Sequence, residues 1–232
     1  MPAGSIWDVS IPHFAVSDGY AVYRGPVTDS TPHRHAAFQV AIAIGGEVAM
    51  VDGSANQHRA VALVVAPMTR HRMLANADLL TYFVEPHCVF ADRLRERCRD
   101  DITAAPELRG LRAGDIGVSP SGALDPRLVT ALTTLSDRAV PMPSLAAMVG
   151  LSPQRLRALA RQQVGMPLAR WRLWARLRRA TEALRAGQSL ADASATAGFA
   201  DQAHLTRAMR DMMGLSPSAV LPVLRGHSRH AT

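Results

Sequence analysis

The chain of 232 residues contains no lysine, only two cysteines and few aromatic residues (5%). Cys88 and Cys98 are too few for a disulfide-stapled scaffold, so we expect idle thiols, with a redox sensor as the alternative. No run of about 18 apolar residues is present, and this excludes a membrane-spanning helix. The first ten residues show no basic segment followed by an apolar one, so we expect no signal peptide and a cytoplasmic protein.

Charge is distributed unevenly between the two halves of the chain. Residues 127–232 carry 15 arginines against 5 acidic residues, a net charge of +10, whereas residues 1–126 carry 11 arginines against 14 acidic residues, a net charge of −3. A basic surface gains affinity for duplex DNA by releasing the counterions that surround the phosphates. The asymmetry therefore points to a polyanionic partner for the C-terminal half alone, with a merely solvated basic face as the alternative.

Short apolar segments interrupted by Gly, Pro, Asp and Asn fill residues 22–85. We predict strands over residues 38–44, 48–51, 60–65 and 79–84, with a hairpin turn at Asp52-Gly53. Several short strands at this spacing indicate a barrel or a sandwich. From residue 128 to about residue 224 the periodicity is helical.

The segment between these two regions has a mixed character. Residues 90–102 are predicted as a charged helix, which either forms a dimer contact or presents a solvated face. Residues 104–122 are rich in Pro and Gly and are predicted as a linker. We therefore divide the chain into a β domain (1–88), a helical and linker segment that is a candidate for dimerisation (89–126) and an all-α domain (127–232).

The C-terminal half contains one pattern twice. Three residues recur 49 positions later, so that Ser152, Leu156 and Gly165 correspond to Asp201, Leu205 and Gly214. Each copy is predicted as a short helix, a turn with glycine, a longer helix capped by Ser152 or Asp201, and a final glycine. This is the outline of a helix-turn-helix, present twice. A helix over residues 168–186, with Trp171 and Trp174 as core residues, is predicted to join the copies and to place them in adjacent major grooves.

The second helix of each copy has a polar face that suits the reading of DNA bases. Arginine pairs with guanine, glutamine pairs with adenine, and alanine or threonine contacts the thymine methyl group. The candidate DNA-binding residues are Gln154, Arg157, Arg161, Gln202, Ala203, Thr206, Arg207 and Arg210. An ordinary solvated helix face is the alternative for either helix taken alone.

The segments Gly198 to Arg207 and Gly214 to Ser218 resemble the signature of the AraC/XylS family of transcription regulators, and Gly165 to Leu168 with Trp174 resembles its linker helix. The resemblance covers about the last 95 residues. It implies a cytoplasmic DNA-binding regulator that acts on RNA polymerase, with Gln154, Arg157, Gln202, Thr206 and Arg207 at DNA-contacting positions. Three residues depart from the family pattern, and they put base reading by the first copy in doubt: Pro143, Ala158 and Ala160.

Histidines cluster in the N-terminal half with the spacing His33-x-His35-x3-Gln39, followed by His71. This spacing resembles the two motifs of cupin barrels, with Gln39 in place of the usual glutamate. Period-two geometry is expected to put His33, His35 and Gln39 on one strand face, with His71 on a neighbouring strand. Three imidazoles suit Zn, Fe, Ni or Cu, but a barrel that has lost its metal and binds a small organic effector is the alternative.

The remaining histidines show no spacing that supports a site. We expect a local structural contact for His204 and surface positions for the others, which are His13, His58, His87, His227 and His230.

Together these features predict an α+β protein of two domains, a cupin-like β-barrel followed by an all-α double helix-turn-helix domain. The leading hypothesis is a non-enzymatic, sequence-specific transcription regulator that binds double-stranded DNA and is controlled by a small-molecule or metal effector. We expect it to form a homodimer and not to associate with membranes. A metal sensor with ligands His33, His35, Gln39 and His71 is a variant of it. The alternative is a metal-dependent, dioxygenase-like cupin enzyme with a helical appendage.

Overall fold

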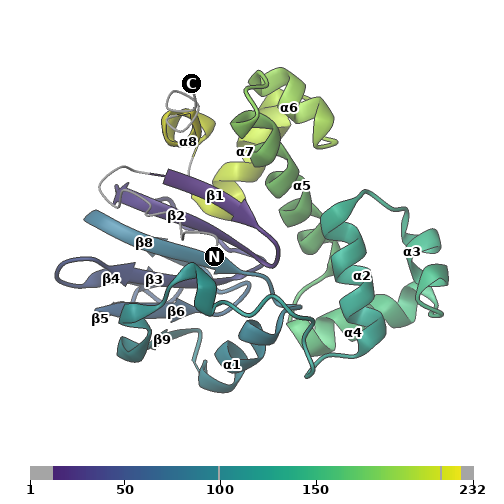
Figure 1. Cartoon of the computed structure of the whole chain (residues 1–232), viewed down its shortest axis with the longest axis horizontal. Coiled ribbons are helices and arrows are strands. Elements are labelled where there is room, and N and C mark those ends of the chain that lie inside the picture. Colours follow the sequence, from purple (N-terminus) through teal and green to yellow (C-terminus); the bar gives the residue numbers. More distant parts are fainter. Residues whose placement is uncertain (1–12, 99, 215, 226–232) are drawn as a thin grey trace, which may run out of the picture.

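The computed structural model describes residues 13–98, 100–214 and 216–225. It shows a sheet-rich region that begins at His13 and is followed by a helical domain (Figure 1). The two-domain α+β architecture predicted from the sequence is therefore confirmed. The strands are β1 (His13–Ser17), β2 (Tyr20–Val27), β3 (Phe38–Ala43), β4 (Val48–Asp52), β5 (Gln57–Ala60), β6 (Ala62–Val65), β7 (His71–Met73), β8 (Asn76–Val84) and β9 (Ile102–Ala104).

These strands form two antiparallel sheets. The larger has the order β1-β2-β8-β3-β6-β9, and the smaller has the order β5-β4-β7. The hairpin expected at Asp52-Gly53 joins β4 to β5, and the Asp52 carboxylate accepts hydrogen bonds from the backbone of Ser54 and Asn56. An Asx-type turn of this kind sets the register of the two strands.

Strand β3 is central and is buried on both faces, in keeping with a sequence that is apolar except for Gln39. Phe38, Val40 and Ile42 point to one side, and the alternate residues Ala41 and Ala43 point to the other. The second side faces the small sheet, where Val48, Met50 and Met73 complete a core between the sheets. Gln39 lies on this inner side, which places its amide inside the β domain.

The segment after β8 packs on the outer face of the large sheet. Helix α1 (Val89–Arg97) buries Phe90 and Leu94 there, so its apolar face is already covered by its own domain. The predicted helix over residues 90–102 was too long, because Ile102 begins β9 and pairs with Val65. The segment predicted as a linker holds two short 3-10 helices, η1 (Pro106–Gly110) and η2 (Ala113–Asp115), and its residues Leu111 and Ile116 are buried against the same face.

The C-terminal domain consists of short helices around one long one. The helices are α2 (Pro126–Asp137), α3 (Met142–Met148), α4 (Pro153–Val164), α5 (Leu168–Arg185), α6 (Leu190–Thr196), α7 (Gln202–Met213) and α8 (Pro217–Arg225). Trp171 and Trp174 of α5 are fully buried, as predicted. Trp171 donates a hydrogen bond from Nε1 to the carbonyl of Leu132 in α2. The long helix therefore forms the centre on which both helix-turn-helix units are assembled.

The two domains share a continuous apolar interface. Phe14, Ala36 and Phe83 of the β domain belong to the same buried cluster as Trp174 and Leu177 of α5. Figure 1 shows α7 and α8 beside β1 and β2, while α3 and α4 lie at the other end of the molecule. Among the residues that the structure describes, no helix has the length and apolarity that crossing a bilayer requires.

Candidate functional site

The two helix-turn-helix units have the same local construction. Ser152 caps α4 by accepting a hydrogen bond from the backbone of Arg155, and Asp201 caps α7 by accepting one from the backbone of His204. Each of these helices has 12 residues and ends at a left-handed glycine, Gly165 (φ 69°) or Gly214 (φ 67°). The repeat seen in the sequence therefore corresponds to a repeat in structure, down to the caps.

The polar faces of these two helices lie at the surface. On α4, Gln154, Arg157 and Arg161 are exposed, while Leu156 and Leu159 are buried. Within the part of the chain that the structure describes, no ion pair engages either arginine of this face. Their charge therefore remains available to phosphates or base edges.

On α7 the exposed residues are Gln202, Ala203, Arg207 and Arg210. Thr206 is half-buried, and its hydroxyl donates to the carbonyl of Gln202 at 2.9 Å, so this proton is already used within the helix. The imidazole of His204 accepts a hydrogen bond from the backbone of Ala200 through Nδ1, which is the local structural contact expected for it. The exposure of these residues does not test whether they contact DNA bases. The eight DNA-binding residues therefore stay predictions.

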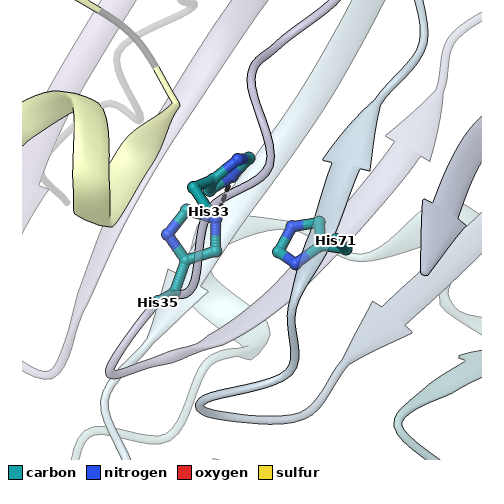
Figure 2. A group of neighbouring side chains, drawn as sticks. All are labelled: His33, His35 and His71. Carbon is teal, nitrogen blue, oxygen red and sulfur yellow. Dashed lines mark hydrogen bonds between the residues drawn. The ribbon is translucent and has the colours of Figure 1, made fainter. Parts of the chain in front are cut away.

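The structure brings His33, His35 and His71 together in the β domain (Figure 2). One ligand atom of each lies within 4.8 Å of the others, and all three side chains are buried. His33 and His35 lie in the segment before β3, so the prediction that they share a strand face with Gln39 was wrong. An isolated antiparallel bridge between His33 and His71 brings the histidines together instead, because it joins this segment to the start of β7.

The outer ring nitrogens of His33 and His71 are held by backbone carbonyls, whereas Nδ1 of His35 is buried without a hydrogen-bond partner among the described residues. Nδ1 of His33 lies 2.8 Å from the carbonyl of Thr31, and Nδ1 of His71 lies 3.0 Å from the carbonyl of Thr69. Nε2 of His33 lies 3.1 Å from Nε2 of His35, and Nε2 of His71 lies 2.8 Å from Oε1 of Gln39. The side chains named from the sequence therefore face one another through the Nε2 atoms of the histidines and Oε1 of Gln39.

Burial lowers the pKa of all three imidazoles. It lowers the pKa of His71 to about 3, and it holds the pKa of His35 well below its usual value with further help from the two neighbouring rings. For His33 burial again dominates, although the Thr31 carbonyl opposes it. The cluster is therefore neutral at pH 7 and offers lone pairs rather than positive charge.

A cavity of about 190 Å³ lies beside the histidines. Its walls are mainly apolar, with Phe14, Tyr23 and Phe83 among them, and its polar side includes His33 and Gln39. The helical domain contributes Thr181 of α5, Met213 of α7 and Val220 of α8. The cavity is therefore shared between the two domains and not enclosed by the β domain alone.

A second polar group at the domain interface was missed by sequence reasoning. Glu85, at the end of β8, is buried and pairs through Oε1 with Arg178 of α5 at 2.6 Å, and it accepts a hydrogen bond from Nε1 of Trp174 at 3.1 Å. His87, expected at the surface, is buried against the ring of Trp171. His58 is partly buried and pairs with Asp52, His13 is partly buried, and His227 and His230 lie outside the described residues.

Comparison with known proteins identifies the class. Residues 145–221 match the family described as helix-turn-helix domain. The fold resembles crystal structures of ToxT from Vibrio cholerae. The O395 protein has a TM-score of 0.58 at 9% identity, covering 90% of this chain and 100% of that one. Unsaturated-fatty-acid-bound ToxT from strain SCE256 has a TM-score of 0.58 at 10% identity, covering 91% and 98%. No curated protein sequence matches the chain.

The chain is therefore a double helix-turn-helix protein attached to a β domain. The helix-turn-helix domain, matched over residues 145–221, is of the AraC/XylS type. These findings favour a transcription factor over the alternative of a cupin enzyme with a helical appendage.

Proposed function

We propose that this chain is a sequence-specific transcription regulator whose binding to duplex DNA is controlled by a small effector in the interdomain cavity. The observation that carries the proposal is the shared wall of the cavity. Its lining joins Phe14 and Phe83 of the β domain to Met213, the last residue of α7. A molecule in the cavity thus touches the end of a helix whose exposed face carries Arg207.

The lining indicates the chemistry of the effector. Its apolar walls favour an apolar body, and the polar groups of Ser30, His33 and Gln39 on one side favour a hydrogen-bonding head. A cavity of about 150 Å³ in another protein holds benzene, so about 190 Å³ suits a single ring or a short chain with a polar head.

The related fold supports an acidic head. Crystal structures of ToxT contain an unsaturated fatty acid in one case and (E)-4-(8-methylnaphthalen-1-yl)but-3-enoic acid in another, and both ligands are carboxylic acids with apolar bodies. The cavity of this chain suits a more compact member of that class.

Control of DNA binding requires that the effector bind two arrangements of the domains with different affinity. The cavity meets this requirement, because its two walls belong to different domains and any relative movement changes the contacts that the effector makes. Coupling free energies of this kind are typically about 1–3 kcal/mol, which corresponds to a 5- to 150-fold change in affinity.

The test begins with the full chain and a duplex obtained by in vitro selection. Fluorescence anisotropy measures its affinity at several salt concentrations, with a scrambled duplex as the control, and then in the presence of benzoate, octanoate or benzyl alcohol. We expect selective, salt-sensitive binding and a change of at least fivefold with one of the three compounds. Equal affinity for the selected and scrambled duplexes contradicts the regulator function itself.

Contacts with RNA polymerase and homodimer formation also stay part of the proposal. The polymerase contact follows from the resemblance to the family, and the dimer follows from the charged helix predicted after the β domain. The exposed side of α1, with Arg93 and Glu96, is the surface on which the dimer was predicted. Sedimentation analysis of the full chain with and without the selected duplex tests the dimer.

A further inference from the structure

We propose that His33, His35 and His71 hold a late first-row transition-metal ion through their Nε2 atoms, with Gln39 Oε1 as a fourth donor. We further infer that this ion fixes the position of α7. The second part rests on the proposed function above, whereas the first part does not depend on it.

The hydrogen bonds of the outer nitrogens determine which atom of each ring is free. A backbone carbonyl can only accept, so Nδ1 of His33, at 2.8 Å from the Thr31 carbonyl, and Nδ1 of His71, at 3.0 Å from the Thr69 carbonyl, carry the protons. A neutral imidazole has one proton, so Nε2 of each ring has a lone pair. The same arrangement, with the second nitrogen bound to a carbonyl, orients histidines that ligate metals.

The lone pair of His71 is directed at another acceptor. Nε2 of His71 lies 2.8 Å from Oε1 of Gln39, and the orientation of that amide is set by its nitrogen, which donates to Sδ of Met73 at 3.5 Å. Two acceptors at this distance repel each other unless one cation binds both of them. Nε2 of His35 lies 3.1 Å from Nε2 of His33, so the three buried rings each bring a ligand atom within 4.8 Å of the others, and Oε1 of Gln39 lies beside that of His71.

The donor set indicates the class of ion. Three neutral imidazoles and an amide oxygen suit Zn²⁺, Cu²⁺, Ni²⁺ or Co²⁺ and are poor ligands for Mg²⁺ or Ca²⁺, which prefer oxygen. None of these four ligands carries a negative charge, so the bound ion keeps its full charge. Since His33, His35 and Gln39 also line the cavity, and no arginine does so among the described residues, the ion supplies the positive charge that an acidic effector needs there.

The cluster is in direct contact with the end of α7. A Cβ atom added to Gly214 would lie 2.5 Å from Nδ1 of His33 and 3.0 Å from the carbonyl of Thr31. The backbone of Arg34, between the first two histidines, donates to the carbonyl of Asp211 in α7 at 3.4 Å. On the other side the ring of His35 lies 6.4 Å from that of Trp174 in α5. An ion that immobilises His33 and His35 therefore immobilises the surface on which α7 ends.

The metal site is tested by titrating the chelator-treated full chain with Co²⁺ and following the visible absorption of the bound ion, then displacing it with Zn²⁺. We expect one Co²⁺ per chain. Variants H33Q and H71Q should bind at least about 100-fold more weakly, since even indirect partners of metal ligands are worth 10- to 100-fold. H87Q is the matched control, because His87 is also buried but lies outside the cluster.

One further variant separates the loss of a metal ligand from misfolding as the cause of weaker Co²⁺ binding. Gln39→Glu adds a carboxylate to the ligand set and should bind Co²⁺ more tightly than the natural chain, a gain that misfolding cannot produce. Absence of Co²⁺ binding by the natural chain, or binding that H33Q and H71Q leave unchanged, overturns the metal site.

The coupling is measured separately, as the affinity of the selected duplex for the metal-free and Zn²⁺-loaded chain. We expect at least a fivefold difference in the natural chain and none in H71Q. Equal affinities would refute the coupling while leaving the metal site intact. Selective duplex binding by the metal-free chain tests the regulator function independently of both.

Discussion

Replacing Gly214 by alanine tests the contact between α7 and the histidine cluster, and Gly165 provides a matched control. The two glycines occupy the same position of the repeat, with φ of 67° and 69°. At Gly165 an added Cβ meets nothing within 4 Å, whereas at Gly214 it meets Nδ1 of His33 at 2.5 Å and the carbonyl of Thr31 at 3.0 Å. The pair therefore separates the cost of the left-handed backbone from the cost of the contact.

The expected magnitudes follow from that difference. Alanine in the left-handed conformation costs about 1–2 kcal/mol at either position. At Gly214 the added methyl group must also displace the segment that carries His33, and overpacking of this kind costs about 1–3 kcal/mol more. In urea denaturation of the metal-free full chain, the free energy of unfolding of G214A should therefore be lower than that of G165A by about 1–3 kcal/mol. The slope of this free energy against urea concentration, the m-value, should be the same in both variants.

The same pair has a functional readout. G214A should weaken Co²⁺ binding because it moves His33, while G165A should leave Co²⁺ binding unchanged. Equal loss of stability in the two variants, together with equal Co²⁺ affinity, would show that α7 and the histidines do not touch and would refute the reasoning.

Three further outcomes are expected. R207A should weaken binding to the selected duplex by about 1–3 kcal/mol if this side chain reads a base. R185A, at an exposed arginine outside α4 and α7, should change this affinity by much less. Equal effects of the two variants in fluorescence anisotropy argue against base reading. R178M leaves the Glu85 carboxylate buried without its partner and should lower the free energy of unfolding by about 3–5 kcal/mol, an effect that the added change E85Q should largely reverse in urea denaturation. Burial lowers the pKa of His87, so the unfolded chain binds a proton below about pH 6.5 that the folded chain does not, and stability falls as the pH falls. H87Q should flatten this decline between pH 7 and pH 5, and an unchanged slope would contradict the assignment.

Features that depend on neighbouring residues were predictable from the sequence. The caps at Ser152 and Asp201 and the glycines that end α4 and α7 are set by hydrogen bonds and φ angles within a few positions, so the repeat could be predicted with its helix bounds. The buried positions of Trp171 and Trp174 followed from the apolar stripe of α5. The convergence of His33, His35, Gln39 and His71 followed from the resemblance of their spacing to the cupin motifs, whereas the strand assignment derived from period-two geometry was wrong.

Features created by contacts between distant segments could not be predicted. Glu85 and His87 look like surface residues in the sequence, but Arg178 and Trp171 cover them from α5, more than 80 positions away. The Pro- and Gly-rich segment after β9 resembled a linker because Leu111 and Ile116 are too sparse to form a periodic pattern, yet both fill the face of the large sheet. The contact of Gly214 with His33 likewise needed the arrangement of the two domains.

The most direct test of the account is the affinity of the full chain for its selected duplex, measured by anisotropy with and without Zn²⁺ in the same titration series. The account predicts binding that is selective against a scrambled duplex, weakens with salt and changes at least fivefold when Zn²⁺ is added. Binding that is equal for both duplexes and indifferent to the ion would contradict it.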